Sequence, residues 1–299
     1  MRITRRGVLV GAGVSTAGVL GGVAGIAGGV LPGRSVLYGR LGLDGRDGVV
    51  PDGAAGPRES GEIVSAARGG RRCGWTLALP PEPGGPGGSD GRGLPVVVVL
   101  HGRGADHTAA FAEDYLGLDR FLAAAVADGV APFALVSVDG GEAYWHARAD
   151  GDDLAAMVLE ELLPLLAARG LDTDRLGFLG WSMGGFGALH LGALVGSGRV
   201  RAVAAVSPAL WHDHADTPAG AFDGPEDFAA VTVLGRQDDL DGIAVRVDCG
   251  LGDPFCAASQ DYVDGFADRP DGGFERGDHD RGYWRRIAPR QLAFLGRHL

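Results

Sequence analysis

Ser182 lies in the stretch GWSMGG, residues 180–185, and fits the pattern Gly-x-Ser-x-Gly. A serine hydroxyl attacks a carbonyl carbon when a neighbouring base removes its proton, and this pattern is typical of a nucleophile on a sharp turn between a strand and a helix. The chain has 54 glycines, so five matching residues are weak evidence alone. The alternative is a structural serine in a glycine-rich turn. The patterns of the flanking segments distinguish the two interpretations.

Those segments have the patterns of a buried strand and a helix. Residues 175–180 (RLGFLG) predict the strand, and the small, apolar residues 184–195 predict the helix. Glycine on either side of the serine permits the strained turn, and the helix N-terminus then points at the serine oxygen. This context favours Ser182 as a nucleophile.

The base and the acid follow from chain order, which in this architecture is serine, acid, histidine. Of the eight histidines, seven are disfavoured by position: His101, His107 and His146 precede Ser182, His190 lies in the next helix, His212 and His214 follow too soon, and His298 ends the last helix. His279, in GDHDRGYW, remains as the base. The acid is Asp253 or Asp248, and Asp253 is favoured because it lies in the loop beyond the strand.

Acyl transfer also needs backbone N–H donors for the oxyanion of the tetrahedral intermediate. We expect one from Met183, directly after the nucleophile, and the other from Arg103 in the HGRG loop that follows the apolar run 96–100. His101 is expected to hydrogen-bond this loop rather than to catalyse.

Aromatic residues are candidates for substrate contacts. Tyr144, Trp145 and His146 follow a predicted strand, where sheets of this kind bind ligands; they either line the pocket or form a packed aromatic corner. Residues 209–222 read as a cap over the site, from which Trp211 could contact substrate. No cluster with metal-ligand spacing is evident, so no metal is expected.

Strands and helices alternate along the rest of the chain, which predicts a mostly parallel sheet covered by helices on both faces. We expect one catalytic α/β domain over residues 71–299, preceded by a linker or loose arm at 31–70. The expected strands are 74–80, 96–100, 133–139, 175–180, 200–208 and 243–250, and the expected helices are 108–127, 152–169, 184–195, 254–267 and 283–299.

Residues 1–30 have the features of a targeting signal. Arg2, Arg5 and Arg6 precede an uncharged stretch of small and apolar residues at 7–30, and the sequence TRRGVL resembles a twin-arginine export signal. The stretch is also long enough to span a bilayer. We therefore expect export, with the segment either cleaved or kept as a membrane anchor.

Composition narrows the classes of function. The formal net charge of −11 argues against a nucleic-acid partner, and the absence of lysine excludes lysine-centred catalysis. Because an exported chain permits disulfides, Cys249 and Cys256 are expected to form a bridge and to leave Cys73 unpaired; three buried thiols are the alternative.

The stretches VVVVLHGRG, GWSMGGFGAL, VDCGLGDPF and GDHDRGYWRRIAPRQLAFL together resemble the esterase D and mycolyltransferase-related branch of the α/β-hydrolases. The resemblance covers about residue 93 to the C-terminus and implies Ser182, Asp253 and His279 as a triad that acts without metal or organic cofactor. The sequence thus predicts an exported serine esterase acting on a small-molecule or lipid ester. The alternatives are an acyltransferase to a sugar or glycerol hydroxyl and a non-catalytic surface binding protein.

Overall fold

The computed structural model describes residues 39–40, 42, 44–81 and 91–299. They form an eight-stranded sheet in the order β1-β2-β4-β3-β5-β6-β7-β8. The first two strands are antiparallel to their neighbours, and β3 to β8 are parallel. The strands are β1 Arg58–Ser65, β2 Arg71–Ala78, β3 Pro95–Leu100, β4 Ala134–Val138, β5 Asp172–Trp181, β6 Val200–Val206, β7 Ala244–Gly250 and β8 Asp271–Glu275.

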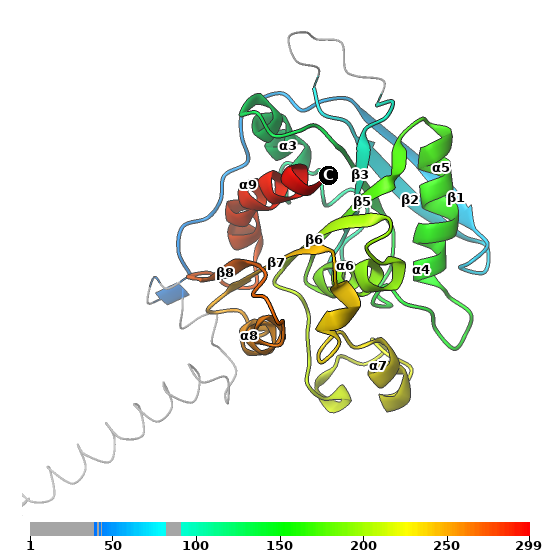
Figure 1. The fold of residues 1–299 in the computed structure, drawn as a ribbon, viewed down its shortest axis with the longest axis vertical. Coiled ribbons are helices and arrows are strands. Elements are labelled where there is room, and N and C mark those ends of the chain that lie inside the picture. The colour runs from blue at the N-terminus through cyan, green and yellow to red at the C-terminus, as the bar shows by residue number, and fades with distance from the viewer. Residues whose placement is uncertain (1–38, 41, 43, 82–90) are drawn as a thin grey trace, which may run out of the picture.

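Helices cover both faces of the sheet (Figure 1). One face packs against α3 and α9; the other packs against α5, α6 and α8. The helical segments are α3 Leu118–Ala127, α4 Leu154–Ala156, the π-helical turn Met157–Leu162, α5 Leu163–Ala168, α6 Met183–Val195, α7 Pro225–Val231, α8 Cys256–Asp264 and α9 Arg281–His298, with short 3-10 turns at His214–Asp216 and Gln237–Leu240. The predicted α/β-hydrolase arrangement, a mostly parallel sheet between two helical layers, is confirmed.

The strand order places the candidate site. From β3 the chain goes to β4 on one side and then crosses over β3 to β5 on the other side. In open parallel sheets the crevice at such a reversal, beyond the carboxyl ends of the strands, is where ligands bind. The HGRG loop follows β3 and Ser182 follows β5, so both lie at this edge.

Two expectations about individual segments were wrong. The segment 31–70, expected to be a linker, contains β1, which pairs with β2 over its whole length. The helix expected at 108–127 begins only at Leu118, because Gly117 has φ 61° and interrupts the helical backbone. The strand β8 and the helix α7 were not expected.

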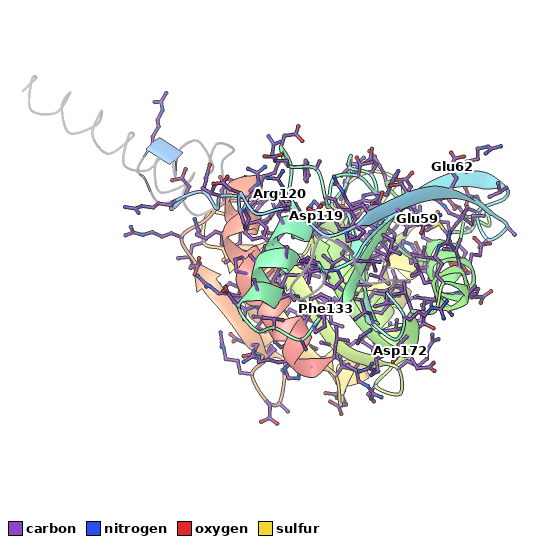
Figure 2. All side chains as sticks on the ribbon, turned by 90° about the horizontal axis from the view of Figure 1, so that it is seen from above. Glu59, Glu62, Asp119, Arg120, Phe133 and Asp172 are labelled. Atoms are coloured by element: carbon purple, nitrogen blue, oxygen red, sulfur yellow. The ribbon has the colours of Figure 1, made fainter. Side chains whose placement is uncertain are left out.

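The edge strand β1 lacks the apolar alternation that marks a half-buried strand, because most of its side chains are exposed. Glu59 pairs with Arg169 at 2.9 Å and Glu62 with Arg72 at 3.0 Å. Figure 2 labels both glutamates on this strand at the margin of the molecule. Charged side chains on an edge strand hinder pairing with another sheet, which accounts for a polar strand in this place.

The predicted export segment, residues 1–30, lies outside the described residues. Within the described part of the chain, no helix is long and apolar enough to cross a membrane.

Because β1 belongs to the sheet, the domain boundary can be tested by deletion. A chain that lacks residues 1–70 exposes the β2 edge and loses eight paired residues, so we expect it to be insoluble or strongly destabilised. A chain that lacks only residues 1–43 retains β1 and should unfold cooperatively. Thermal melts of the soluble fractions test this, and equal melting temperatures would contradict it.

Candidate active site

Ser182, His279 and Asp253 form a continuous hydrogen-bonded chain. The distance between Ser182 Oγ and His279 Nε2 is 2.9 Å, and that between His279 Nδ1 and Asp253 Oδ2 is 2.8 Å. The Asp253 side chain is fully buried, whereas the His279 side chain keeps 24% of its exposure. The structure thus brings together three residues that are 97 and 26 positions apart in the sequence.

The backbone at Ser182 is strained, with φ 56° and ψ −123°. Two glycines make this turn possible. A Cβ on Gly180 would lie 2.0 Å from the Gly184 carbonyl oxygen, and a Cβ on Gly184 would lie 1.9 Å from the Leu100 carbonyl oxygen. The close approach of β3, β5 and α6 that these glycines permit projects the serine from the end of the sheet.

The Asp253 carboxylate is held on both oxygens. Its Oδ1 accepts a hydrogen bond from the Phe255 N–H at 2.8 Å, while Oδ2 faces His279. The other candidate acid, Asp248, is bound at both oxygens by the Arg246 guanidinium, at 2.7 and 2.8 Å. Burial raises the pKa of Asp248, although Arg246 opposes this. Asp248 is therefore committed to an ion pair within β7.

The bridge expected between Cys249 and Cys256 is not formed. All three cysteines, including Cys73, are buried thiols. Cys249 and Cys256 nevertheless lie close together at the two ends of the loop that carries Asp253, and the hydrogen bond to Cys256, with burial, raises the pKa of the Cys249 thiol. The loop thus owes its shape to packing and hydrogen bonds rather than to a disulfide.

His279 lies in the loop between β8 and α9. The Asp280 side chain caps α9 by accepting the Tyr283 N–H, and the His279 N–H donates to Asp278 Oδ1 at 2.8 Å. Two aromatic rings contact the imidazole, those of Phe255 and Trp284, each with ring centroids 5.2 Å away. Neither ring was singled out from the sequence, although each lies within five residues of the triad.

Of the two predicted oxyanion donors, Met183 directly follows Ser182 in the chain. Met183 is the first residue of α6, where a backbone N–H has no acceptor within the helix. In the HGRG loop, His101 Nε2 accepts the Gly140 N–H at 2.9 Å, so Nδ1 carries the proton and donates to the Gly102 carbonyl at 2.8 Å.

This arrangement orients the peptide between Gly102 and Arg103. The carbonyl and the N–H of one trans peptide point in opposite directions, so the Arg103 N–H is turned away from His101. A Cβ on Gly102 would lie 3.2 Å from the Ser182 Cβ, which shows that the loop passes beside Ser182. Burial lowers the pKa of His101, in keeping with a neutral ring that only orients the loop.

The three residues Tyr144, Trp145 and His146 form a packed corner. Trp145 is fully buried, and its indole occupies the space left by Gly140 and Gly187. His146 is also fully buried and pairs with Asp227 at 3.0 Å. The structure therefore supports the packing interpretation for Trp145 and His146. Tyr144 is nearly buried too, and burial raises its pKa to about 12.

Trp211 is the predicted contact that faces the site. It is partly exposed at the start of the segment 209–232, which includes α7, and its ring lies 5.4 Å from Tyr144 and 5.2 Å from Phe255. Since Phe255 touches His279, the rings of Tyr144, Trp211 and Phe255 form an aromatic wall that reaches His279. Arg148 holds this segment to the domain through Asp223, at 2.8 Å.

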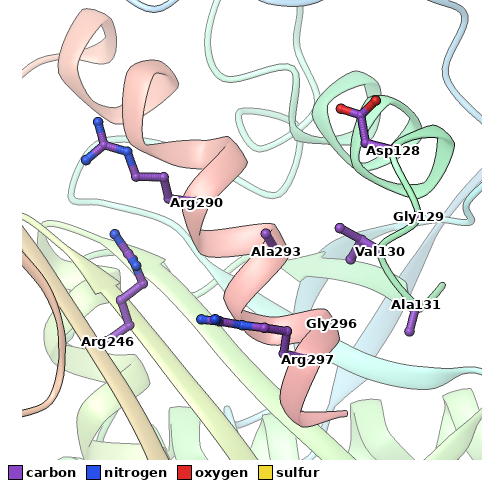
Figure 3. A pocket seen from close by; sticks show the side chains of 9 residues that line it. All are labelled: Asp128, Gly129, Val130, Ala131, Arg246, Arg290, Ala293, Gly296 and Arg297. Atoms are coloured by element: carbon purple, nitrogen blue, oxygen red, sulfur yellow. The ribbon is translucent and has the colours of Figure 1, made fainter.

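A pocket of about 620 Å³ lies elsewhere, between α9, β7 and residues 128–131 (Figure 3). Its arginines are paired with carboxylates: Arg246 with Asp248 at 2.7 Å, Arg290 with Glu275 at 2.9 Å and Arg297 with Asp271 at 3.6 Å. The last two pairs tie α9 to β8, so we assign these arginines a structural role. Within the described residues, no group of three or more acidic, histidine or cysteine side chains is placed to hold a metal.

Comparisons with known proteins identify a family for this chain. The model of the family described as "Putative esterase" matches residues 66–295. No curated protein sequence matches this chain closely enough to be counted.

Solved structures resemble this chain in fold. A ferulic acid esterase has a TM-score of 0.66 at 21% identity, covering 81% of this chain and 99% of its own. An S-formylglutathione hydrolase from Agrobacterium tumefaciens has a TM-score of 0.67 at 17% identity, covering 83% and 98%. A fluorophosphonate-binding serine hydrolase from Staphylococcus aureus has a TM-score of 0.64 at 18% identity, covering 81% and 99%. At these identities the likeness establishes the fold alone.

Because Gly184 lies against β3, we expect one added methyl group at this position to destabilise the protein. Gly184→Ala must push α6 away from the Leu100 carbonyl, so we expect a loss of about 1–3 kcal/mol in the free energy of unfolding, measured with urea. Gly198→Ala is the matched control, because a Cβ there meets nothing within 4 Å. Equal unfolding midpoints for the two variants would contradict the prediction.

Proposed function

This chain belongs to the esterase family whose model matches residues 66–295, and we propose that it is an exported serine esterase that hydrolyses carboxylic esters through an acyl-enzyme. The observation that carries the proposal is the hydrogen-bonded chain from Ser182 through His279 to Asp253, at 2.9 and 2.8 Å. The family supports the reaction class, and the contacts among the three side chains support their assignment as nucleophile, base and acid.

The proposed reaction has two halves. His279 Nε2 takes the proton from Ser182 Oγ as the oxygen attacks the ester carbonyl carbon, and Asp253 stabilises the imidazolium and holds its orientation. The N–H groups of Met183 and Arg103 donate to the oxyanion. The intermediate collapses when the alcohol leaves with the proton from His279. Water then attacks the acyl-enzyme by the same route and releases the acid.

The aromatic wall suggests where the substrate lies. Phe255 is partly exposed beside His279, and Trp211 is partly exposed beside Phe255, so an apolar part of the ester can pack against them while its carbonyl reaches Ser182. Tyr144 packs against Trp211. We therefore propose a small-molecule or lipid ester as the substrate, and no nucleic-acid partner, in keeping with the net charge of −11.

Covalent labelling tests the nucleophile. A fluorophosphonate probe should label the wild-type protein, and Ser182→Ala should abolish the label and lower kcat by about 10³-fold or more. Ser197→Ala, a serine between α6 and β6, is the control that should label normally. Folded wild-type protein that takes no label would refute the enzyme proposal and favour a non-catalytic binding protein.

The acid is tested in the same assay. Asp253→Asn keeps the size of the side chain but loses the charge that fixes the histidine tautomer, so kcat should fall by about 10⁴-fold. A loss of tenfold or less would contradict the role of Asp253.

The acceptor of the acyl group is tested by competition. The acyltransferase alternative requires the same three side chains and differs only in the hydroxyl that attacks the acyl-enzyme. With glycerol or trehalose added, a hydrolase should still release free acid as its main product. Acylated glycerol or trehalose as the main product would support the alternative.

Export is proposed from the paired arginines of the N-terminal segment. Replacing both, as Arg5→Lys with Arg6→Lys, should hold the full-length chain in the cytoplasm, whereas Arg2→Lys should not. Immunoblots of fractionated cells report the location, and the mass of the exported form tells cleavage from anchoring. An unchanged distribution of the double variant would exclude the twin-arginine route.

A further inference from the structure

The short segment that follows β6, residues 207–209, contacts both Ser182 and Trp284, and Trp284 packs against His279. The Ala209 N–H donates to the Ser182 carbonyl at 2.9 Å, just beyond the point where the Ser182 N–H donates to Val206 at 3.1 Å. Two residues earlier than Ala209, the Ser207 hydroxyl accepts the indole N–H of Trp284 at 3.0 Å. One stretch of backbone therefore connects the serine turn with α9.

Trp284 in turn limits the position of His279. The two rings are perpendicular, with centroids 5.2 Å apart, and Phe255 contacts the same imidazole at 5.2 Å. The hydrogen bond from Nδ1 to Asp253 fixes one atom of the imidazole, but the ring could still swing about that atom. The two aromatic rings restrict this swing, and they do so only while their own positions are fixed.

Trp284 differs from other buried tryptophans of this protein in having a hydrogen-bond acceptor for its indole N–H. The indole nitrogens of Trp75, Trp145 and Trp181 are buried and make no hydrogen bond within the described residues. Trp284, also buried, has a hydroxyl acceptor.

Ser207 itself is held in an unfavourable conformation. It is fully buried and has φ 49°, which is uncommon for a residue with a Cβ. Its N–H donates to the Asp248 carbonyl at 2.8 Å, so the end of β7 helps to hold the turn. Backbone strain of this kind persists only where the surrounding contacts enforce it, and such sites are concentrated near functional centres.

We propose that Ser207 and Trp284 are positioning residues that together set the separation between Ser182 Oγ and His279 Nε2. This inference rests on the proposed esterase function. Neither residue touches the reacting atoms; Ser207 holds the indole, and the indole holds the imidazole. Proton transfer between oxygen and nitrogen is sensitive to small misplacements, so loosening this contact should slow the chemical step and leave ester binding intact.

The test compares Ser207→Ala and Trp284→Phe, which remove the same hydrogen bond from opposite ends, with the double variant. With a small chromogenic acetate ester, each single variant should lower kcat by about 10-fold and leave KM within about twofold. Since both changes remove one interaction, the double variant should be no slower than the slower single variant. The rate of fluorophosphonate labelling should fall in parallel.

Tyr283→Phe is the matched control, because Tyr283 is a buried neighbour on α9 whose hydroxyl makes no hydrogen bond to the part of the chain that the structure describes. It should retain full kcat. Unchanged kcat in folded Ser207→Ala, additive losses in the double variant, or an equal loss in Tyr283→Phe would each overturn the inference while the esterase proposal stands. Wild-type protein that neither takes the label nor hydrolyses the ester would overturn both.

Discussion

The strained backbone of Ser182 is the constraint on which the rest of the site depends. A residue with φ 56° and ψ −123° keeps that conformation only if its surroundings enforce it. Here the Ser182 N–H donates to the Val206 carbonyl, and the Ser182 carbonyl accepts the Ala209 N–H. The glycines at 180 and 184 let α6 lie against β3 and β5. Three strands must therefore end at fixed positions before the serine can project from the sheet.

The parallel sheet places the other two groups at the same edge. Asp253 follows β7 and His279 follows β8, and these strands are neighbours that run in the same direction as β5. Their carboxyl ends are therefore adjacent, and two short loops are sufficient to complete the hydrogen-bonded chain. The geometry of this hydrogen-bonded chain therefore depends on the sheet, since a shift of β7 or β8 would move Asp253 or His279.

The elements that could be predicted from the sequence are those whose structure is determined by local sequence patterns. Residues 175–195 show a buried run, a glycine-flanked serine and a run of small residues, and each pattern reports a contact that its own segment makes. The edge strand Arg58–Ser65 is exposed on most positions, so no apolar alternation reports it. Asp271–Glu275 contains two glycines and pairs at the other edge, which again leaves no hydrophobic signal. The roles of Phe255 and Trp284 depend on long-range packing around His279, which spacing alone does not encode.

The distinction between Asp248 and Asp253 shows why position relative to a strand carries chemical information. A side chain within a strand is committed to one face of the sheet. Asp248 is paired in register with Val206, on the face covered by α9, where only a charged partner such as Arg246 can make burial of a carboxylate tolerable. Asp253 lies beyond the strand end, so its loop can direct the carboxylate along the edge of the sheet toward the histidine. The carboxylate that contacts His279 lies off both faces of the sheet, and the glycines at 250 and 252 precede it in the chain.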